Sequence, residues 1–143
     1  MKLLSRVALA LALAAGAACS SITPVAVNVG DQCFRCRRPI LETRLAAEMV
    51  DSSRLAYKFR TTGCLAKYLV DHPSDTGTLF VTDFTSGKMM PTADATFVPV
   101  VLDPNTGESD YRAYRNKADA DKAAQELHAT ALDWTTVLAK TRS

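Results

Sequence analysis

A pair of cysteines, Cys33 and Cys36, is the sequence feature that most restricts how this chain can fold. Two thiols at this spacing either bind one soft metal ion together or close into a small disulfide ring. Three arginines, Arg35, Arg37 and Arg38, surround the pair and favour the thiolate, the form that binds metals and attacks electrophiles. We therefore expect the rest of the chain to be a scaffold that brings this pair to a surface.

The N-terminus has the features of a bacterial lipoprotein signal. A basic start with Lys2 and Arg6 precedes an apolar run, residues 7–15, which is too short to cross a bilayer as a helix. Three small residues then lead directly to Cys19, the order that cleavage and lipidation require. We expect residues 1–18 to be a signal peptide and Cys19 to carry the lipid. Ordinary secretion without a lipid is the alternative.

The remaining chain divides into a tether and one domain. Residues 19–32 are expected to be the lipidated cysteine and a flexible tether, because residues 20–30 carry no charge and include Ser, Thr, Pro and Val. Residues 33–143 are enough for one small domain. Removing the signal takes two of the 17 basic residues and leaves 15 basic against 15 acidic. This neutral balance argues against nucleic-acid binding, which needs a basic surplus.

Alternating apolar and polar residues predict a β-hairpin after the cysteine pair. Its strands are expected at residues 44–50 and 54–60. In the first strand Met49 should point to the core and Glu48 to the opposite face. In the second strand we expect Leu55 to point inward.

A helix is expected directly after this hairpin. Thr61-Thr62-Gly63 supplies a threonine as N-cap, and the helix should stop before Pro73. Cys64 lies in the first helical turn, where the helix dipole favours a thiolate. It also lies on an apolar stripe with Tyr68, which favours a buried and inert cysteine instead. Both interpretations stay open at this point.

The second half of the sequence contains further strands and helices. Strands are predicted at residues 78–84, 95–102 and 109–114, and helices at residues 117–128 and 133–140. Pro99 indicates an edge or a bulge, because proline cannot donate a ladder hydrogen bond. Leu127 should face the sheet at the end of its helix. The order ββα followed by βββα predicts an α+β fold, with small antiparallel sheets packed against two main helices.

Three cysteines remain for chemistry once Cys19 is set aside, and we predict that Cys33, Cys36 and Cys64 bind a metal. Cu(I) suits them because it prefers two or three soft ligands. Met49 and Met89 are additional candidate ligands, although the inward position of Met49 favours a place in the core.

Other interpretations of the three thiols remain open. Zinc is the closest alternative metal and needs a fourth ligand, for which His72 is the candidate. Without a metal, Cys33 and Cys36 would form a structural disulfide or a disulfide that exchanges with other thiols. We find no serine–histidine–carboxylate pattern and no phosphate-binding loop, so we expect no enzyme activity.

Four segments resemble one known family over most of the chain from Cys33 onward. They are CFRCRRPI, the hairpin RLAAEMVDSSRLAYKF with the helix start TTGCLAKYL, the strand region LFVTDFTSGKMMPTADATFV, and an alanine-rich helix before the closing Asp-Trp-x-x-Val-Leu. Together they resemble the NosL family, copper-binding lipoproteins that accompany nitrous oxide reductase. The resemblance implies a fold of two similar small αβ halves and delivery of Cu(I) to that enzyme.

Two segments depart from the pattern of this family. NosL proteins usually have Gly-Met after the Cys-x-x-Cys, where this chain has Arg37-Arg38. They also carry a Met-Gly-x-Glu or Met-Gly-His segment associated with copper, where this chain has residues 111–114, Tyr-Arg-Ala-Tyr. The three cysteines are then the best remaining copper ligands.

The sequence therefore predicts a lipid-anchored copper carrier, facing the periplasm from the cell membrane or the outer membrane. Its partners would be the membrane, through the lipid on Cys19, and a copper-accepting apo-enzyme such as nitrous oxide reductase. The alternatives are a thiol–disulfide redox lipoprotein that uses Cys33 and Cys36, and a metal-free interaction lipoprotein with a structural disulfide.

Overall fold

A four-stranded antiparallel sheet forms the first half of the protein. The computed structural model describes residues 21–143, so the predicted signal peptide and Cys19 lie outside the described part. The strands of this sheet, in chain order, are β1 (Ala47–Val50), β2 (Ala56–Phe59), β3 (Thr78–Thr82) and β4 (Met89–Pro91). Their spatial order is β2-β1-β3-β4, so β1 and β3 are central. The predicted hairpin is therefore extended by two strands from the next segment of the chain.

The predicted start of the first strand is wrong. Thr43–Leu45 forms a short 3₁₀ helix, because the Glu42 side chain accepts a hydrogen bond from the backbone N–H of Arg44 and turns the chain there. The strand that follows is buried on both faces, so its alternating sequence does not mark a solvent-exposed side.

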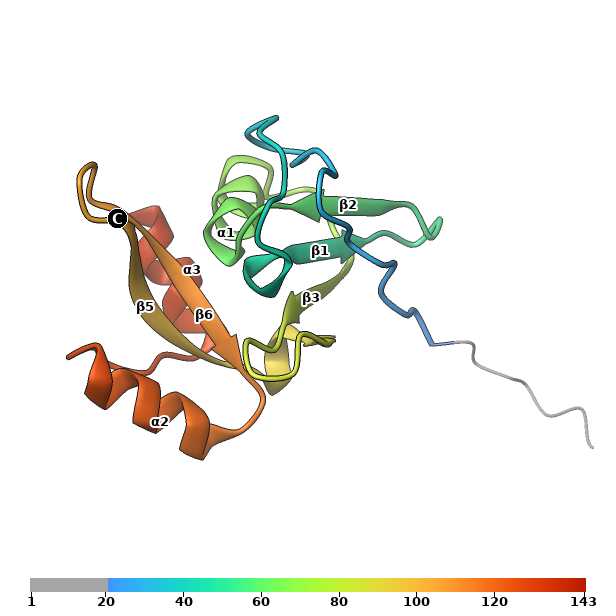
Figure 1. The fold of residues 1–143 in the computed structure, drawn as a ribbon. Helices are drawn as coiled ribbons and strands as arrows, with labels where there is room; N and C mark the ends of the chain where they lie inside the picture. Colours follow the sequence, from blue (N-terminus) through green and yellow to red (C-terminus); the bar gives the residue numbers. More distant parts are fainter. Residues whose placement is uncertain (1–20) are drawn as a thin grey trace, which may run out of the picture.

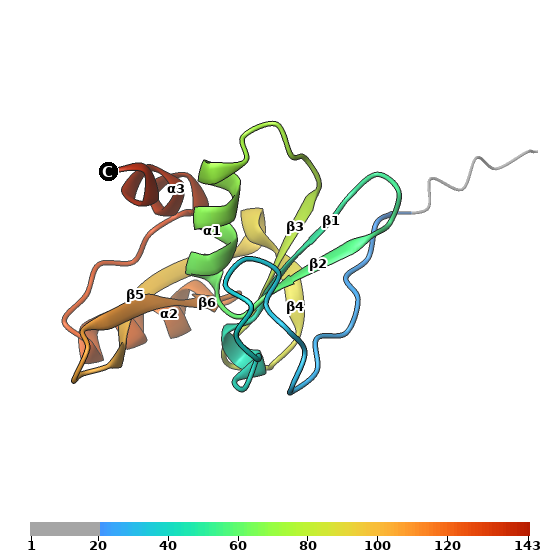
Figure 2. The same ribbon diagram turned by 90° about the horizontal axis from the view of Figure 1, so that it is seen from above.

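Helix α1 (Thr62–Asp71) lies between the two halves of the molecule (Figure 2). It begins and ends as predicted: the Thr61 side chain caps it by accepting from the N–H of Cys64, and His72 ends it just before Pro73. The helix contacts β1 and β2 on one side and β6 and α3 of the second half on the other. The apolar stripe through Leu65 therefore joins both halves in one core.

The second half contains a two-stranded sheet and two helices (Figure 1). Its elements are β5 (Thr96–Asp103), β6 (Glu108–Tyr114), α2 (Lys117–Glu126) and α3 (Trp134–Arg142). Both strands are edges, as Pro99 in β5 indicated. The predicted three-strand group is divided, because β3 pairs with β1 rather than with β5. The fold is α+β as predicted, with three α-helices and sheets of unequal size.

Two contacts fasten the sheets to each other. The backbone N–H of Phe84 donates to the carbonyl of Ala113 at 2.7 Å, beside a parallel bridge between Asp83 and Ala113. The buried Asp83 carboxylate accepts from the N–H of Arg115 at 3.0 Å and from Ser86 in its own turn. Hydrogen bonding keeps the pKa of Asp83 below its usual value although burial opposes this. Asp83 is therefore a turn residue that also holds β6.

Two predicted side-chain orientations are wrong: Leu55 and Leu127 were expected to point inward but are 56% and 38% exposed. Glu48 lies on the outer face of the hairpin as predicted, yet it is 0% exposed. Glu48 is buried because the N-terminal segment crosses the outer face of β1, where the N–H of Val25 donates to Oε1 at 2.8 Å. Part of the predicted tether thus contacts the domain. None of the helices described in residues 21–143 is long and apolar enough to span a bilayer.

Candidate metal centre

The Cys33–Cys36 segment is a tight loop fixed against the edge of the first sheet. The N–H of Cys33 donates to the carbonyl of Arg38 at 2.9 Å, and the N–H of Arg37 donates to the carbonyl of Cys33 at 3.0 Å. Arg37 adopts a left-handed backbone conformation, with φ of 61°, which lets the loop turn back on itself. The N–H of Phe34 donates to the carbonyl of Lys58 in β2. These contacts position Cys33 in the core, where it is 0% exposed.

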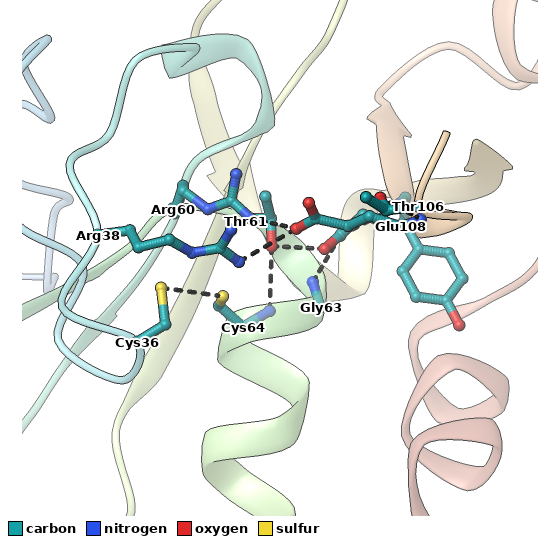
Figure 3. Close-up of polar contacts among 10 residues, drawn as sticks. Cys36, Arg38, Arg60, Thr61, Gly63, Cys64, Thr106 and Glu108 are labelled. Carbon is teal, nitrogen blue, oxygen red and sulfur yellow. Dashed lines mark hydrogen bonds and ion pairs between the residues drawn. The ribbon is translucent and has the colours of Figure 1, made fainter. Parts of the chain in front are cut away.

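Helix α1 presents the third thiol from its first turn. The side chain of Thr61 accepts a hydrogen bond from the N–H of Cys64 at 3.1 Å. This cap fixes the helix start, so the Cys64 side chain points toward the Cys33–Cys36 loop (Figure 3). Cys64 is 8% exposed. Cys64 is therefore both buried on the apolar stripe and close to the other two thiols.

The three thiols form one cluster in the described part of the chain. The sulfur atoms of Cys33, Cys36 and Cys64 all lie within 4.8 Å of one another, and those of Cys36 and Cys64 are 3.9 Å apart. A metal with sulfur bonds of about 2.3 Å separates its sulfurs by about 4.0 Å in a trigonal site and about 4.6 Å in a linear one. The cluster therefore has the dimensions of a two- or three-coordinate soft-metal site without rearrangement of the backbone.

Hydrogen bonding and burial shift the pKa values of the two buried thiols in opposite directions. The pKa of Cys33 is lowered, first by a hydrogen bond from Cys64 and then by the backbone N–H groups of Cys36 and Arg60, against the effect of burial. The pKa of Cys64 is raised, because its proton is shared with the Cys33 sulfur and its site is desolvated. The helix dipole alone predicted the opposite direction for Cys64. These shifts favour the thiolate on Cys33 over a thiolate on Cys64.

An arginine–glutamate network lies over the cluster. The interaction of the Arg38 guanidinium with the Cys36 side chain raises the pKa of Arg38. Glu108 of β6 forms ion pairs with Arg38, at 3.2 Å, and with Arg60 (Figure 3). Since three thiolates on one monovalent ion carry a net charge of about −2, these cations offset charge that the metal leaves uncompensated. The sequence indicated the role of Arg38 but not that of Arg60 or Glu108.

Asp110 of β6 supports the helix start that carries Cys64. Its carboxylate accepts from the hydroxyl of Thr61 and from the N–H of Gly63, the latter at 2.7 Å. A Cβ atom at position 63 would lie 2.6 Å from Asp110 Oδ2, so a larger residue there would displace the carboxylate. Burial raises the pKa of Asp110, and these hydrogen bonds oppose the shift. Sequence reasoning missed Asp110, because nothing local indicates that β6 meets the start of α1.

The other candidate ligands come from β1, β4 and the end of α1. Met49 is buried in β1 and its side chain approaches Gly77. Met89 lies in β4, at the opposite edge of the sheet from β2, which places it about 14 Å from the edge that holds the loop. His72 stacks on Tyr68 at the far end of α1, with ring centroids 4.5 Å apart. Neither His72 nor any carboxylate in the described residues joins the three thiols.

Comparisons with known proteins support the fold. No protein-family model matches the sequence, and no curated protein matches it. Among solved structures, the crystal structure of the copper chaperone NosL from Shewanella denitrificans is similar, with a TM-score of 0.64 over 80% of this chain and 95% of that chain. The two sequences are 15% identical over this range. The predicted NosL-like α+β fold is thereby confirmed.

Proposed function

We propose that this protein is an exported, lipid-anchored carrier of Cu(I). The observation that carries the proposal is the convergence of three thiols, from two separate elements, within 4.8 Å. Two of them, Cys33 and Cys64, are buried, which protects a bound ion from water and oxidants. The fold that this chain shares with a copper chaperone is consistent with that cargo.

Copper fits the donor set better than zinc does. A structural zinc site has four ligands, whereas residues 21–143 offer a cluster of three. Cu(I) accepts two or three thiolates, and the sulfur separations suit both geometries. The excess negative charge of such a site is matched by Arg38 and Arg60, which lie beside it. The proposed cargo is therefore one Cu(I) ion for each chain.

The cellular context of the carrier is inferred from the N-terminus. A lipid on Cys19 would hold the domain at the cell membrane or the outer membrane, on the periplasmic side. The recipient would be a copper-accepting apo-enzyme, with nitrous oxide reductase as the example that the NosL resemblance suggests. Nucleic acid is not an expected partner, because the mature chain has as many acidic as basic residues.

An anaerobic titration tests the proposed cargo. The reduced chain is titrated with Cu(I) against a Cu(I)-selective chelator, and we expect one tightly bound equivalent. The double variant Cys33→Ser, Cys36→Ser should lose tight binding, since one thiolate cannot hold the ion against the competitor. Met89→Leu is the matched control, because Met89 is a soft donor distant from the cluster, and it should bind as the unaltered chain does. An unchanged affinity in the double variant would refute the copper site.

Thiol–disulfide exchange is the second candidate function. It is favoured by the proximity of the Cys36 and Cys64 sulfurs, 3.9 Å apart, and by the lowered pKa of the Cys33 thiol. Two thiols would close to a disulfide and pass two electrons and two protons to an oxidised protein disulfide. Turnover in a disulfide-reductase assay, together with no retained Cu(I), would favour this function over the copper carrier. A metal-free interaction lipoprotein with a structural disulfide would show neither activity.

A further inference from the structure

The three thiols of the cluster differ in how they are exposed. Cys33 is 0% and Cys64 is 8% exposed, whereas Cys36 is partly exposed. The neighbours of Cys36 in the loop, Arg35 and Arg37, are both exposed, so the loop faces solvent on this side. An incoming ligand can therefore reach a bound ion past Cys36 more easily than past the two buried thiols.

The thiols also differ in what holds them. The backbone of Cys33 is hydrogen-bonded within its own loop, and the backbone N–H of its neighbour Phe34 donates to β2. Cys64 is held by the helix cap of Thr61, which Asp110 supports in turn. Cys36 is held differently: its sulfur lies 3.9 Å from that of Cys64, and its side chain is only partly buried against the core. Cys36 is therefore less tightly fixed to the sheet and the helix than the two buried thiols are.

Arg38 also lies beside Cys36. Its guanidinium interacts with the Cys36 side chain, which raises the pKa of Arg38, and it forms an ion pair with Glu108 at 3.2 Å (Figure 3).

From these differences we infer that Cys36 is the exchange ligand of the site, the thiolate that a copper acceptor replaces first, while Cys33 and Cys64 retain the ion. This inference rests on the proposed copper-carrier function. In the exchange step, a soft sulfur ligand of the acceptor protein, a thiolate or a thioether, bonds to Cu(I) as the bond to Cys36 breaks. Copper stays Cu(I), and Cys36 leaves as a thiolate with the electron pair of the broken bond. The two buried thiolates are displaced afterwards, when further acceptor ligands engage.

The acceptor class follows from this geometry. Its metal ligand has to reach the loop that carries Cys36, so it should be a protein with an accessible cysteine or methionine rather than one with a deeply enclosed site. The two thiols left after the first step lie within 4.8 Å of each other, close to the separation of about 4.6 Å for linear Cu(I). The ion therefore remains bound during the handover.

A trapping experiment tests the order of release. The full chain is first loaded with Cu(I), and the stoichiometry is measured. Bathocuproine disulfonate is then added as a substoichiometric acceptor together with iodoacetamide, which alkylates any thiolate that leaves the metal. Peptide mass spectrometry reports which cysteine is labelled, and chelator absorbance reports copper loss. We expect Cys36 to be labelled several-fold faster than copper is lost, and Cys33 and Cys64 to be labelled at the rate of loss.

Two serine variants extend the test of the release order. Cys36→Ser should still take up Cu(I) but transfer it at least about tenfold faster than the unaltered chain, since one ligand position is already open. Cys64→Ser is the matched control, and its early labelling at Cys36 should persist. Labelling of Cys33 or Cys64 first, or of all three together with copper loss, would overturn the inference but leave the carrier function intact. Failure of the unaltered chain to take up Cu(I) would overturn both.

Discussion

Replacement of Asp110 tests whether the second half of the protein holds the metal-binding helix in place. Asp110 accepts three hydrogen bonds, from the Thr61 hydroxyl, the Gly63 N–H and the Tyr111 N–H. Asp110→Ala removes both acceptor oxygens, and with them all three hydrogen bonds, and leaves donors at the start of α1 without this partner. Each lost bond costs about 1 kcal/mol, so we expect a loss of about 3 kcal/mol in the free energy of unfolding.

Two further variants separate the hydrogen bonds from the charge. Asp110→Asn keeps the oxygen that Gly63 and Tyr111 use and alters the bond to Thr61, so it should cost only about 1 kcal/mol. Asp121→Ala removes an exposed carboxylate that pairs with Lys117 on α2, and it should cost about 0.5 kcal/mol or less. Asp110→Asn thus tests the charge while most of the hydrogen bonds at the start of α1 are kept, and Asp121→Ala is the control for loss of a surface charge.

The assay is urea unfolding of the reduced, metal-free chain, followed by circular dichroism. The midpoint should fall for Asp110→Ala at an unchanged slope, since the area exposed on unfolding stays the same. In a Cu(I) competition titration the same variant should bind about tenfold more weakly, because the support of a ligand residue has been lost. Stability and Cu(I) affinity within error of the unaltered chain would refute the reasoning that β6 positions Cys64.

Three other perturbations have defined outcomes. Glu48→Gln should raise the melting temperature at pH 7 and leave it unchanged near pH 4, as measured by thermal melts at both pH values. Burial raises the pKa of Glu48 in the folded protein, so ionised Glu48 costs stability once the pH exceeds the pKa of the unfolded chain, and glutamine has no such cost. An equal shift at both pH values would contradict this. Arg38→Gln should weaken Cu(I) binding by about tenfold in competition titrations, because it removes the cation beside the Cys36 sulfur. The control is Arg37→Gln, which removes an arginine that contacts the Phe34 ring and should leave the affinity unchanged. Equal effects of the two substitutions would argue against a specific role of Arg38. Removal of copper by a chelator should leave a cooperative thermal transition, since the core is built without the ion; a metal-free chain that is disordered by circular dichroism would show that metal binding drives folding.

Signals within a few residues of one another made some elements predictable. The start of α1 was correct because Thr61 caps Cys64 three residues on, and its end was correct because Pro73 cannot continue a helix. The start of α2 at Lys117 and the edge position of Pro99 were predictable for the same reason. Each of these features depends on backbone groups that the neighbouring residues satisfy or remove.

Features that depend on distant segments were not predictable in this way. The pairing of β3 with β1 rather than with β5 is decided by which hydrophobic faces meet, and alternation within a strand does not reveal its neighbour. The burial of Glu48 was not predictable, because the segment that covers it, around Val25, lies more than twenty residues earlier. Leu127 was placed on the sheet by its helical period, but α2 ends at Glu126 and the chain turns away there.

The candidate site divides along the same line. The sequence by itself determined the Cys33–Cys36 pair, because two thiols separated by two residues are close in any compact loop. Only the tertiary structure decided that Cys64 lies with them and that His72 does not, since that choice depends on how α1 packs between the two sheets. It likewise brought Glu108 and Asp110 of β6 to the loop and the helix start. Contacts between residues far apart in sequence arise from the packing of whole elements, which no local pattern encodes.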